Sequence, residues 1–389
     1  MCKRGILCIF IALAVTFSGF SDGIEVTGTA PTFKTDDPTA QHFIDEFNDQ
    51  LKDVFDKTLT QIKESIDETV PSGLLNSDGI LSGFGTASVF SSHGATMRAY
   101  ADYNFLSISL GAMVGLQVPA NTMDLINEKI TVEDFLSDDN LIFGINPQAF
   151  SLHIGFNPSV LIKVFPQNLF LGLRIGFFGL NDMDIALSDG VNANLNFNTF
   201  TIGATVNYQL VQSVNWGLIK WNGINLGSGF IYQTTNLDMS IPLGRMVTDI
   251  GNVGGGLDNL RLALDPRVTF NMNINTFTIP VEVMTAIKLI FLNIPLGFGF
   301  DIGLGSSSLS LGIKSPVNIE GDNSHLLEQD KEGNLSVSLE KSASPDVFNL
   351  KLMTGIGFAF GETFAIDIPV TYYFLNNGLN IGFTLGLRF

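Results

Sequence analysis

The sequence predicts an all-β protein, a transmembrane antiparallel β-barrel of about 12 strands with an N-terminal amphipathic helix. Three observations predict it: an export signal, long runs in which apolar residues alternate with small polar ones, and a composition that is apolar yet poor in charge. Of the 389 residues, 45% are hydrophobic and only 15% are charged. Ordinary soluble proteins carry about 25% charged residues.

The composition also excludes several classes of protein. The chain has 33 Phe and 40 Gly, and its formal net charge is −18. Intrinsic disorder is excluded because disordered chains are highly charged and poor in aromatic residues. We expect no nucleic-acid partner, since binding to phosphates needs clustered cations and this chain is acidic without a basic stripe.

Residues 1–21 are typical of a cleaved secretory signal peptide. A positive start, an apolar run and small residues before the cleavage point make up this signal: Lys3, Arg4, the run 5–17, Gly19 and Ser21. An uncleaved membrane anchor is the alternative, but the run is shorter than the ~20 residues that a span needs. Both cysteines, Cys2 and Cys8, lie in this segment, so we expect the exported chain to lack disulfides.

Period-two alternation is clearest in the last strand, where the apolar residues are Leu379, Ile381, Phe383, Leu385, Leu387 and Phe389. A run of this length suits a tilted transmembrane strand, which needs about 9 to 11 residues. A secreted soluble β-protein would also alternate. The polar positions here are Gly, Asn, Thr and Ser rather than Lys and Glu, and this favours the membrane barrel.

The alternation divides the chain into twelve predicted strands: 82–92, 94–103, 105–118, 148–165, 168–180, 195–211, 223–241, 264–290, 293–313, 346–360, 364–374 and 377–389. A hairpin inside 264–290 would make fourteen. With the C-terminus in the periplasm, the longest links fall outside and the tight turns inside, as barrels of this class require. Trp216 and Trp221 lie in an inside link and are expected interface anchors.

The segment 22–80 precedes the barrel, which we assign to residues 81–389. After Asp37-Pro38, apolar residues recur every three or four positions up to residue 70, which predicts an amphipathic helix. The helix could plug the lumen, lie in the periplasm or lie on the membrane. We expect residues 24–70 to occupy or gate the lumen partly, because inward-facing glycines such as Gly299, Gly303 and Gly355 leave room there.

Alternation places several polar and charged side chains in the lumen: Arg98, Asp102, His153, Arg174, Glu282, Asp301, Lys351, Asp367 and Arg388. Their signs are mixed, so no charged ring is expected to select ions. The four histidines, His42, His93, His153 and His325, lack metal-pair spacing, and no catalytic or cofactor motif is present. We therefore expect no metal, no cofactor and no enzymatic activity.

The end of the chain, with Phe383, Leu385, Leu387 and the terminal Phe389, resembles the closing-strand signal of bacterial outer-membrane β-barrel proteins. This resemblance implies an outer membrane in a Gram-negative-type envelope, contact with its lipid, and insertion by the barrel-assembly machinery. The architecture also loosely resembles the long-chain fatty-acid transporter barrels, which have an N-terminal plug, but their N-terminal Asn-Pro-Ala signature is missing.

Two functions follow as expectations. The first is a porin-like passive channel for small or apolar solutes, gated by the N-terminal segment. The alternative is a non-transporting surface adhesin or structural barrel that acts through its external loops.

Overall fold

The computed structural model describes residues 25–34, 38–69, 77–93, 105–118, 142–188, 191–242, 245–251, 260–265, 267–320, 328–361 and 363–389. The signal segment 1–21, the predicted strand 94–103 and the lumen candidates Arg98 and Asp102 lie outside these residues.

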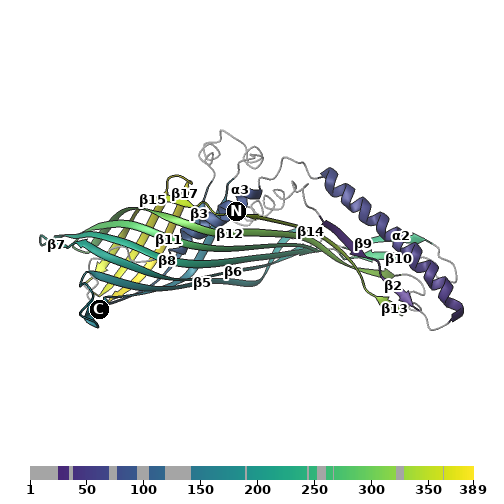
Figure 1. The fold of residues 1–389 in the computed structure, drawn as a ribbon, viewed down its shortest axis with the longest axis horizontal. Helices are drawn as coiled ribbons and strands as arrows, with labels where there is room; N and C mark the ends of the chain where they lie inside the picture. Colours follow the sequence, from purple (N-terminus) through teal and green to yellow (C-terminus); the bar gives the residue numbers. More distant parts are fainter. Residues whose placement is uncertain are drawn as a thin grey trace.

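Among the described residues, ten antiparallel strands close into a ring (Figure 1). They are β3 (Leu106–Gln117), β4 (Gly144–Phe156), β5 (Leu169–Ser188), β6 (Val191–Val211), β8 (Ile219–Pro242), β11 (Arg267–Leu289), β12 (Leu292–Glu320), β15 (Phe348–Phe360), β16 (Phe364–Tyr373) and β17 (Gly378–Arg388). The last strand pairs with the first, with Leu385 opposite Leu110. The pairing of β12 with β15, in which Phe300 lies opposite Leu350, completes the ring.

The ring differs from the predicted 12 strands at its N-terminal side. The segment 82–92 is not a strand; it belongs to the helix α3 (Ser77–Ser92). Its Gly, Ser and Ala residues mimic the alternation of a barrel strand, and they also allow a helix to pack closely on all sides. The segment 264–290, where a hairpin would have made 14 strands, contains the single strand β11.

The ring strands fall into two groups by length. Strands β3, β4, β15, β16 and β17 have 10 to 13 residues, whereas β5, β6, β8, β11 and β12 have 20 to 29. A membrane crossing uses only about 9 to 11 residues. The long strands therefore continue beyond the barrel as an open sheet, away from the C-terminus (Figure 1). The links between predicted strands at 181–194, 242–263 and 314–345 were expected to be external loops, but most of their described residues lie in strands.

Shorter strands complete the open sheet. Strand β14 (Gly333–Ala343) pairs with β12, and β1 (Glu25–Thr29) pairs with β14. Strand β10 (Leu260–Leu264) pairs with β12 and with β9 (Met246–Gly251). Strand β2 (Thr32–Lys34) pairs separately with β13 (Glu328–Lys331), and β7 (Val214–Asn215) pairs with β8 at the opposite end of the molecule.

The long helix α2 (Pro38–Thr69) lies on the open sheet, not in the lumen (Figure 1). Its apolar side packs into a cluster of Phe33, Ile44, Phe47, Leu51, Phe55, Leu262, Leu264, Val317 and Leu335. The prediction that residues 24–70 occupy the lumen is therefore wrong for β1, β2 and α2. Neither helix in the described part of the chain has both the length and the apolar content of a membrane span.

Candidate functional site

The outward face of the ring is apolar. On β11 the outward side chains include Phe277, Val281, Val283 and Ile287, and on β12 they include Leu296. Each of these apolar side chains is at least 36% exposed. So continuous an exposed apolar band would be unfavourable in water, but it matches the hydrocarbon core of a bilayer. The ring thus has the outward apolar band of a bacterial outer-membrane β-barrel.

The band ends at one level across neighbouring strands. On β11 the outward side chains change from Phe277 to Asn275, Asn273 and Asn271, while the inward ones change from Thr276 to Ile274, which is fully buried. Phe277 lies opposite Tyr232 on β8 and Leu304 on β12, and beyond them the outward residues become Thr234 and Ser306. On β6 the same change occurs between Phe200 and Asn198.

This inversion marks the lipid boundary. We call the part of the sheet beyond it the extension: residues 178–188, 191–198, 234–242, 267–275 and 306–320, with β1, β9, β10 and β14. Its outward face is polar and its inward face is apolar. The C-terminus and short turns such as 290–291 lie at the other end of the barrel, which by the rule for such barrels is periplasmic, so the extension is at the external end.

Helix α3 fills the external half of the barrel. Thr86, Ala87, Ser88, Val89 and Phe90 are all completely buried. The start of the helix meets the apolar inner face of the extension, where Leu81 and Phe84 pack into a cluster with Leu195, Met239, Phe270, Ile274 and Leu309. The apolar start of the helix thus meets the apolar part of the inner wall, and its later part lies where the inner wall is polar. We call α3 the plug.

The second half of the plug is held by polar contacts with the barrel wall. The Ser88 hydroxyl lies 3.0 Å from the Thr276 hydroxyl, and the Ser92 hydroxyl donates to Thr278 at 3.0 Å. The Gln233 amide donates to the hydroxyls of Ser88 and Ser91. Every one of these side chains is buried, so each bond offsets the desolvation of its polar atoms.

Glycines on the wall allow the plug to approach closely. A Cβ on Gly144 would collide with the backbone of Gly83, and one on Gly378 would collide with the ring of Phe90. Of the inward glycines considered above, Gly303 lies against Val89 of the plug, whereas Gly299 and Gly355 abut the backbone of a neighbouring strand. Room for an inserted element thus exists, but it is used by α3.

Charged residues meet where the plug ends. Asp301 accepts from Lys351 at 2.6 Å and from Tyr373 at 3.0 Å, and His93 Nε2 lies 2.8 Å from its Oδ2 atom. Lys351 also donates to Glu282 at 2.6 Å. We call these five residues the charge cluster. Asp301 and Lys351 are fully buried, and each buried charge needs its partner because water is excluded.

Three members of the charge cluster carry atoms that could bind a metal. One ligand atom each from His93, Glu282 and Asp301 lies within 4.8 Å of the others. The spacing of the histidines in the sequence predicts no metal site. The Lys351 ammonium lies 2.6 Å from both carboxylates, so it already supplies the positive charge that a cation would bring. The arrangement is therefore that of an ion-paired contact between plug and wall.

The four other lumen candidates that the structure describes also point inward, but they lie elsewhere on the wall. His153 on β4 is paired in register with Arg174 on β5, and both are buried. Arg174 donates to Gln148 at 3.0 Å. Asp367 and Arg388 are buried on β16 and β17. Among the described candidates, Glu282, Asp301 and Lys351 are joined in the charge cluster, while His153 and Arg174 are neighbours elsewhere on the wall.

Two members of the charge cluster were missed by sequence reasoning. Tyr373 lies an even number of residues from Asp367 on β16, so alternation along the strand places both side chains inward. This alternation could have predicted Tyr373 as a lumen residue. No alternation pointed to His93, because the sequence predicted it in the link between the strands 82–92 and 94–103.

The predicted interface and assembly residues lie on the outside. Trp216 is 64% exposed beside the β7–β8 turn, and the Trp221 indole donates to Thr285 at 2.8 Å. Four outward side chains of the closing strand are 37% to 55% exposed: Phe383, Leu385, Leu387 and Phe389.

Comparison with solved structures finds proteins of the bacterial outer membrane. The translocator domain of the autotransporter NalP from Neisseria meningitidis is 10% identical, with 74% of this chain and 90% of that chain covered and a TM-score of 0.28. Ail, the attachment invasion locus protein of Yersinia pestis, is 10% identical, with 74% and 99% covered and a TM-score of 0.24. The outer membrane protein Omp33 of Acinetobacter baumannii is 7% identical, with 74% and 100% covered and a TM-score of 0.23.

The strand pairing of the chain and its outward apolar band define the barrel. No curated protein matches the chain. The model of one protein family matches residues 30–389, which include both helices, the whole barrel and the extension except for β1. The chain therefore belongs to the Lsa36-like family.

Proposed function

We propose that this protein is an outer-membrane barrel that acts at the cell surface through its extension, as an adhesin or structural barrel, and not as a passive channel. One observation carries the proposal: the sheet continues far beyond the lipid boundary, while the external half of the lumen below it is filled by the plug.

The size of the extension supports this function. On β12 the residues from Ser306 to Glu320 lie beyond the boundary, and at about 3.3 Å per residue they reach roughly 45 Å along the strand. Helix α2 buries apolar residues against this sheet and β1 pairs with its strand β14, so the sheet is an ordered platform. A platform of this kind presents a fixed surface to macromolecules outside the cell.

The packing of the plug supports the same conclusion. Its middle residues are completely buried, and close approaches at Gly144 and Gly378 leave no space for another side chain there. A solute would have to displace both the hydrogen bonds of Ser88 and Ser92 and the contact between His93 and Asp301.

The test is liposome swelling with solutes of graded size, combined with binding of the intact protein to immobilised extracellular-matrix proteins. We expect swelling no faster than in protein-free liposomes, together with saturable matrix binding. Swelling with a size cutoff and no matrix binding would overturn the proposal.

A gated channel is the second candidate, and the polarity of the wall behind the plug favours it. Thr276, Thr278, Gln233 and Asn146 face the second half of the plug. If the plug moved away, these side chains would line a hydrated passage. Planar-bilayer recordings of His93→Ala, which removes one contact between plug and wall, should then show current where the wild type shows none.

A further inference from the structure

We infer that the polar outward face just above the lipid boundary is a docking surface for the uncharged sugar headgroups of glycolipids in the external leaflet. The inference goes beyond the proposed function, since it holds whether the barrel adheres or conducts.

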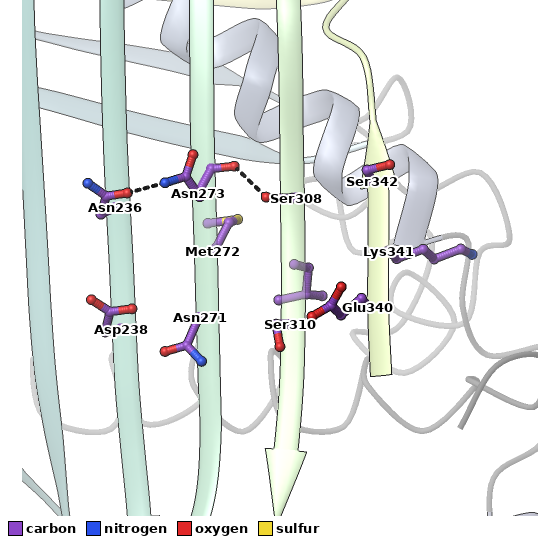
Figure 2. Close-up of a pocket in the computed structure, with 11 residues that line it drawn as sticks. Asn236, Asp238, Asn271, Met272, Asn273, Ser308, Ser310, Glu340, Lys341 and Ser342 are labelled. Atoms are coloured by element: carbon purple, nitrogen blue, oxygen red, sulfur yellow. Dashed lines mark hydrogen bonds between the residues drawn. The ribbon is translucent and has the colours of Figure 1, made fainter. Parts of the chain in front are cut away.

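The surface consists of two cross-strand rows of polar side chains. In the first row Asn236, Asn273, Ser308 and Ser342 are register partners, and in the second row Asp238, Asn271, Ser310 and Glu340 are register partners. Figure 2 shows these side chains side by side on the strands. We call them the amide rows. Together they line a shallow groove of about 440 Å³.

The groove has a firm base. Met272 and Leu309, whose positions alternate with the amide rows, are buried in the apolar cluster that holds Leu81 and Phe84 of the plug. Asn273 donates to the Asn236 side chain, and Ser308 donates to the Asn273 carbonyl at 3.3 Å. These contacts hold the polar side chains in order before a ligand binds, which reduces the entropy lost on binding.

The chemistry of the amide rows suits neutral hydroxyl groups. An amide side chain offers both donors and acceptors, and a serine hydroxyl offers both at once. Neighbouring strands are about 4.8 Å apart, so such groups recur at intervals that the hydroxyls of a sugar ring can bridge. The carboxylates of Asp238 and Glu340 can accept bonds from hydroxyls as well.

Charge argues against a phosphate headgroup. Phosphate recognition relies on Arg and Lys side chains that point at the anion. The groove instead includes the carboxylates of Asp238 and Glu340, and the Lys341 side chain extends away from the amide rows in Figure 2. An anionic lipid headgroup would meet like charge at this surface.

The height of the rows identifies lipid-borne sugars as the occupant. Asn273 and Asn271 lie on the same outward face of β11 as Phe277, on the side of the extension. At about 3.4 Å per residue and a tilt of about 40°, they lie roughly 10 to 15 Å above Phe277. The polar layer of a bilayer adds only about 5 to 7 Å on each side of the hydrocarbon. The amide rows therefore lie above the level of an ordinary phospholipid headgroup, at a height that a larger sugar headgroup reaches. Because the face is continuous with Phe277 and Leu304, a lipid with its chains on these residues presents a sugar to Asn273 and Ser308.

The test uses the full exported chain in detergent micelles and measures retained lipids by native mass spectrometry. Three probes with matched acyl chains are titrated: digalactosyldiacylglycerol, phosphatidylcholine and phosphatidylglycerol. We expect the galactolipid to bind most tightly. The double variant N236L/N273L should weaken galactolipid binding about tenfold, because two hydrogen-bonding side chains are lost.

Asn318→Leu is the matched control, since Asn318 is exposed on the same outward face of β12 but far from the boundary. It should leave galactolipid binding unchanged. Folding of each variant is checked by heat-modifiable migration on gels, and Ser308→Val serves as a second variant if N236L/N273L does not fold.

Equal affinity for the three lipids, tighter binding of phosphatidylglycerol, or unchanged galactolipid binding in the folded row variant would overturn the inference. Free methyl galactoside is the arm that separates lipid-borne from soluble sugars. It should not compete at concentrations that exceed those of the galactolipid, and effective competition would show that the surface takes soluble glycans instead.

Discussion

His93 Nε2 lies 2.8 Å from Asp301 Oδ2, and this contact joins the end of the plug to strand β12 inside the barrel. Asp301 also binds Lys351 and Tyr373, so one carboxylate connects α3 with β15 and β16 as well. Since Asp301 is completely buried, these contacts cannot be replaced by water. The stability of the barrel and the position of the plug are therefore coupled through a single residue.

Replacing Asp301 by Ala should destabilise the barrel by about 3 to 5 kcal/mol, because Lys351 would then be a buried charge with one partner fewer. The measurement is the urea midpoint of the refolded protein, followed by tryptophan fluorescence. Asp265→Ala is the control, since Asp265 is exposed at the end of β10 and should leave the midpoint unchanged. Equal midpoints for the two variants would contradict the structural role of the charge cluster.

A disulfide between plug and wall should separate the two candidate functions. The hydroxyls of Ser92 and Thr278 are 3.0 Å apart, so the double variant S92C/T278C places two thiols together. The disulfide is therefore combined with His93→Ala: if the protein acts only through its extension, planar bilayers should show no current under oxidising or reducing conditions. Current that appears on reduction and disappears on oxidation would instead establish the plug as a gate.

The position of the lipid boundary can be tested with arginine substitutions on β11. Val283 lies midway along the outward apolar part of the strand, and Val283→Arg should destabilise the protein by about 2 to 4 kcal/mol in a bilayer. Asn271→Arg, on the same face but in the extension, should have little effect. Denaturant titrations in lipid vesicles measure both, and a similar cost at the two positions would place the boundary elsewhere.

The extension should be able to open without unfolding the barrel. Phe47 and Leu51 of α2 are completely buried against the extension, and Phe47→Ala should cost about 3 to 5 kcal/mol at this site. We expect faster hydrogen exchange in α2 and β10, with unchanged exchange in β16 and β17. Gln50→Ala, on the exposed side of the same helix, is the control. Uniformly faster exchange would mean that extension and barrel unfold together.

The alternation in the sequence predicts the barrel strands from residue 105 to the C-terminus, but it ends two of the long strands too early and the strand 148–165 too late. It ends strands at 180 and 313, whereas β5 continues to Ser188 and β12 to Glu320, while the strand predicted to end at 241 ends at Pro242. Beyond Leu304, for example, Leu309 points inward and Ser308 outward, so the alternation continues with opposite phase. A strand that leaves lipid for water must invert in this way. On β5 the inversion follows Phe177, and a search for one fixed phase therefore ends that strand at 180.

The strand predicted at 82–92 was wrong for a different reason. Helix α3 is surrounded by protein and has no solvent-facing side, so it lacks the apolar stripe by which a surface helix is recognised. Its small residues alternate with Phe and Val as in a strand. Only the space inside the ring, lined by Gly144 and Gly303, shows that a helix belongs there.

The sequence by itself determined that this chain forms a barrel with an apolar outward face, because alternation with period two follows directly from strand geometry. It also placed Glu282, Asp301 and Lys351 on the inward face. That these residues meet His93 at the end of a plug was decided only by the tertiary structure. Their contact depends on the register between β11, β12 and β15 and on which segment fills the lumen, and neither is encoded in the periodicity of a single strand.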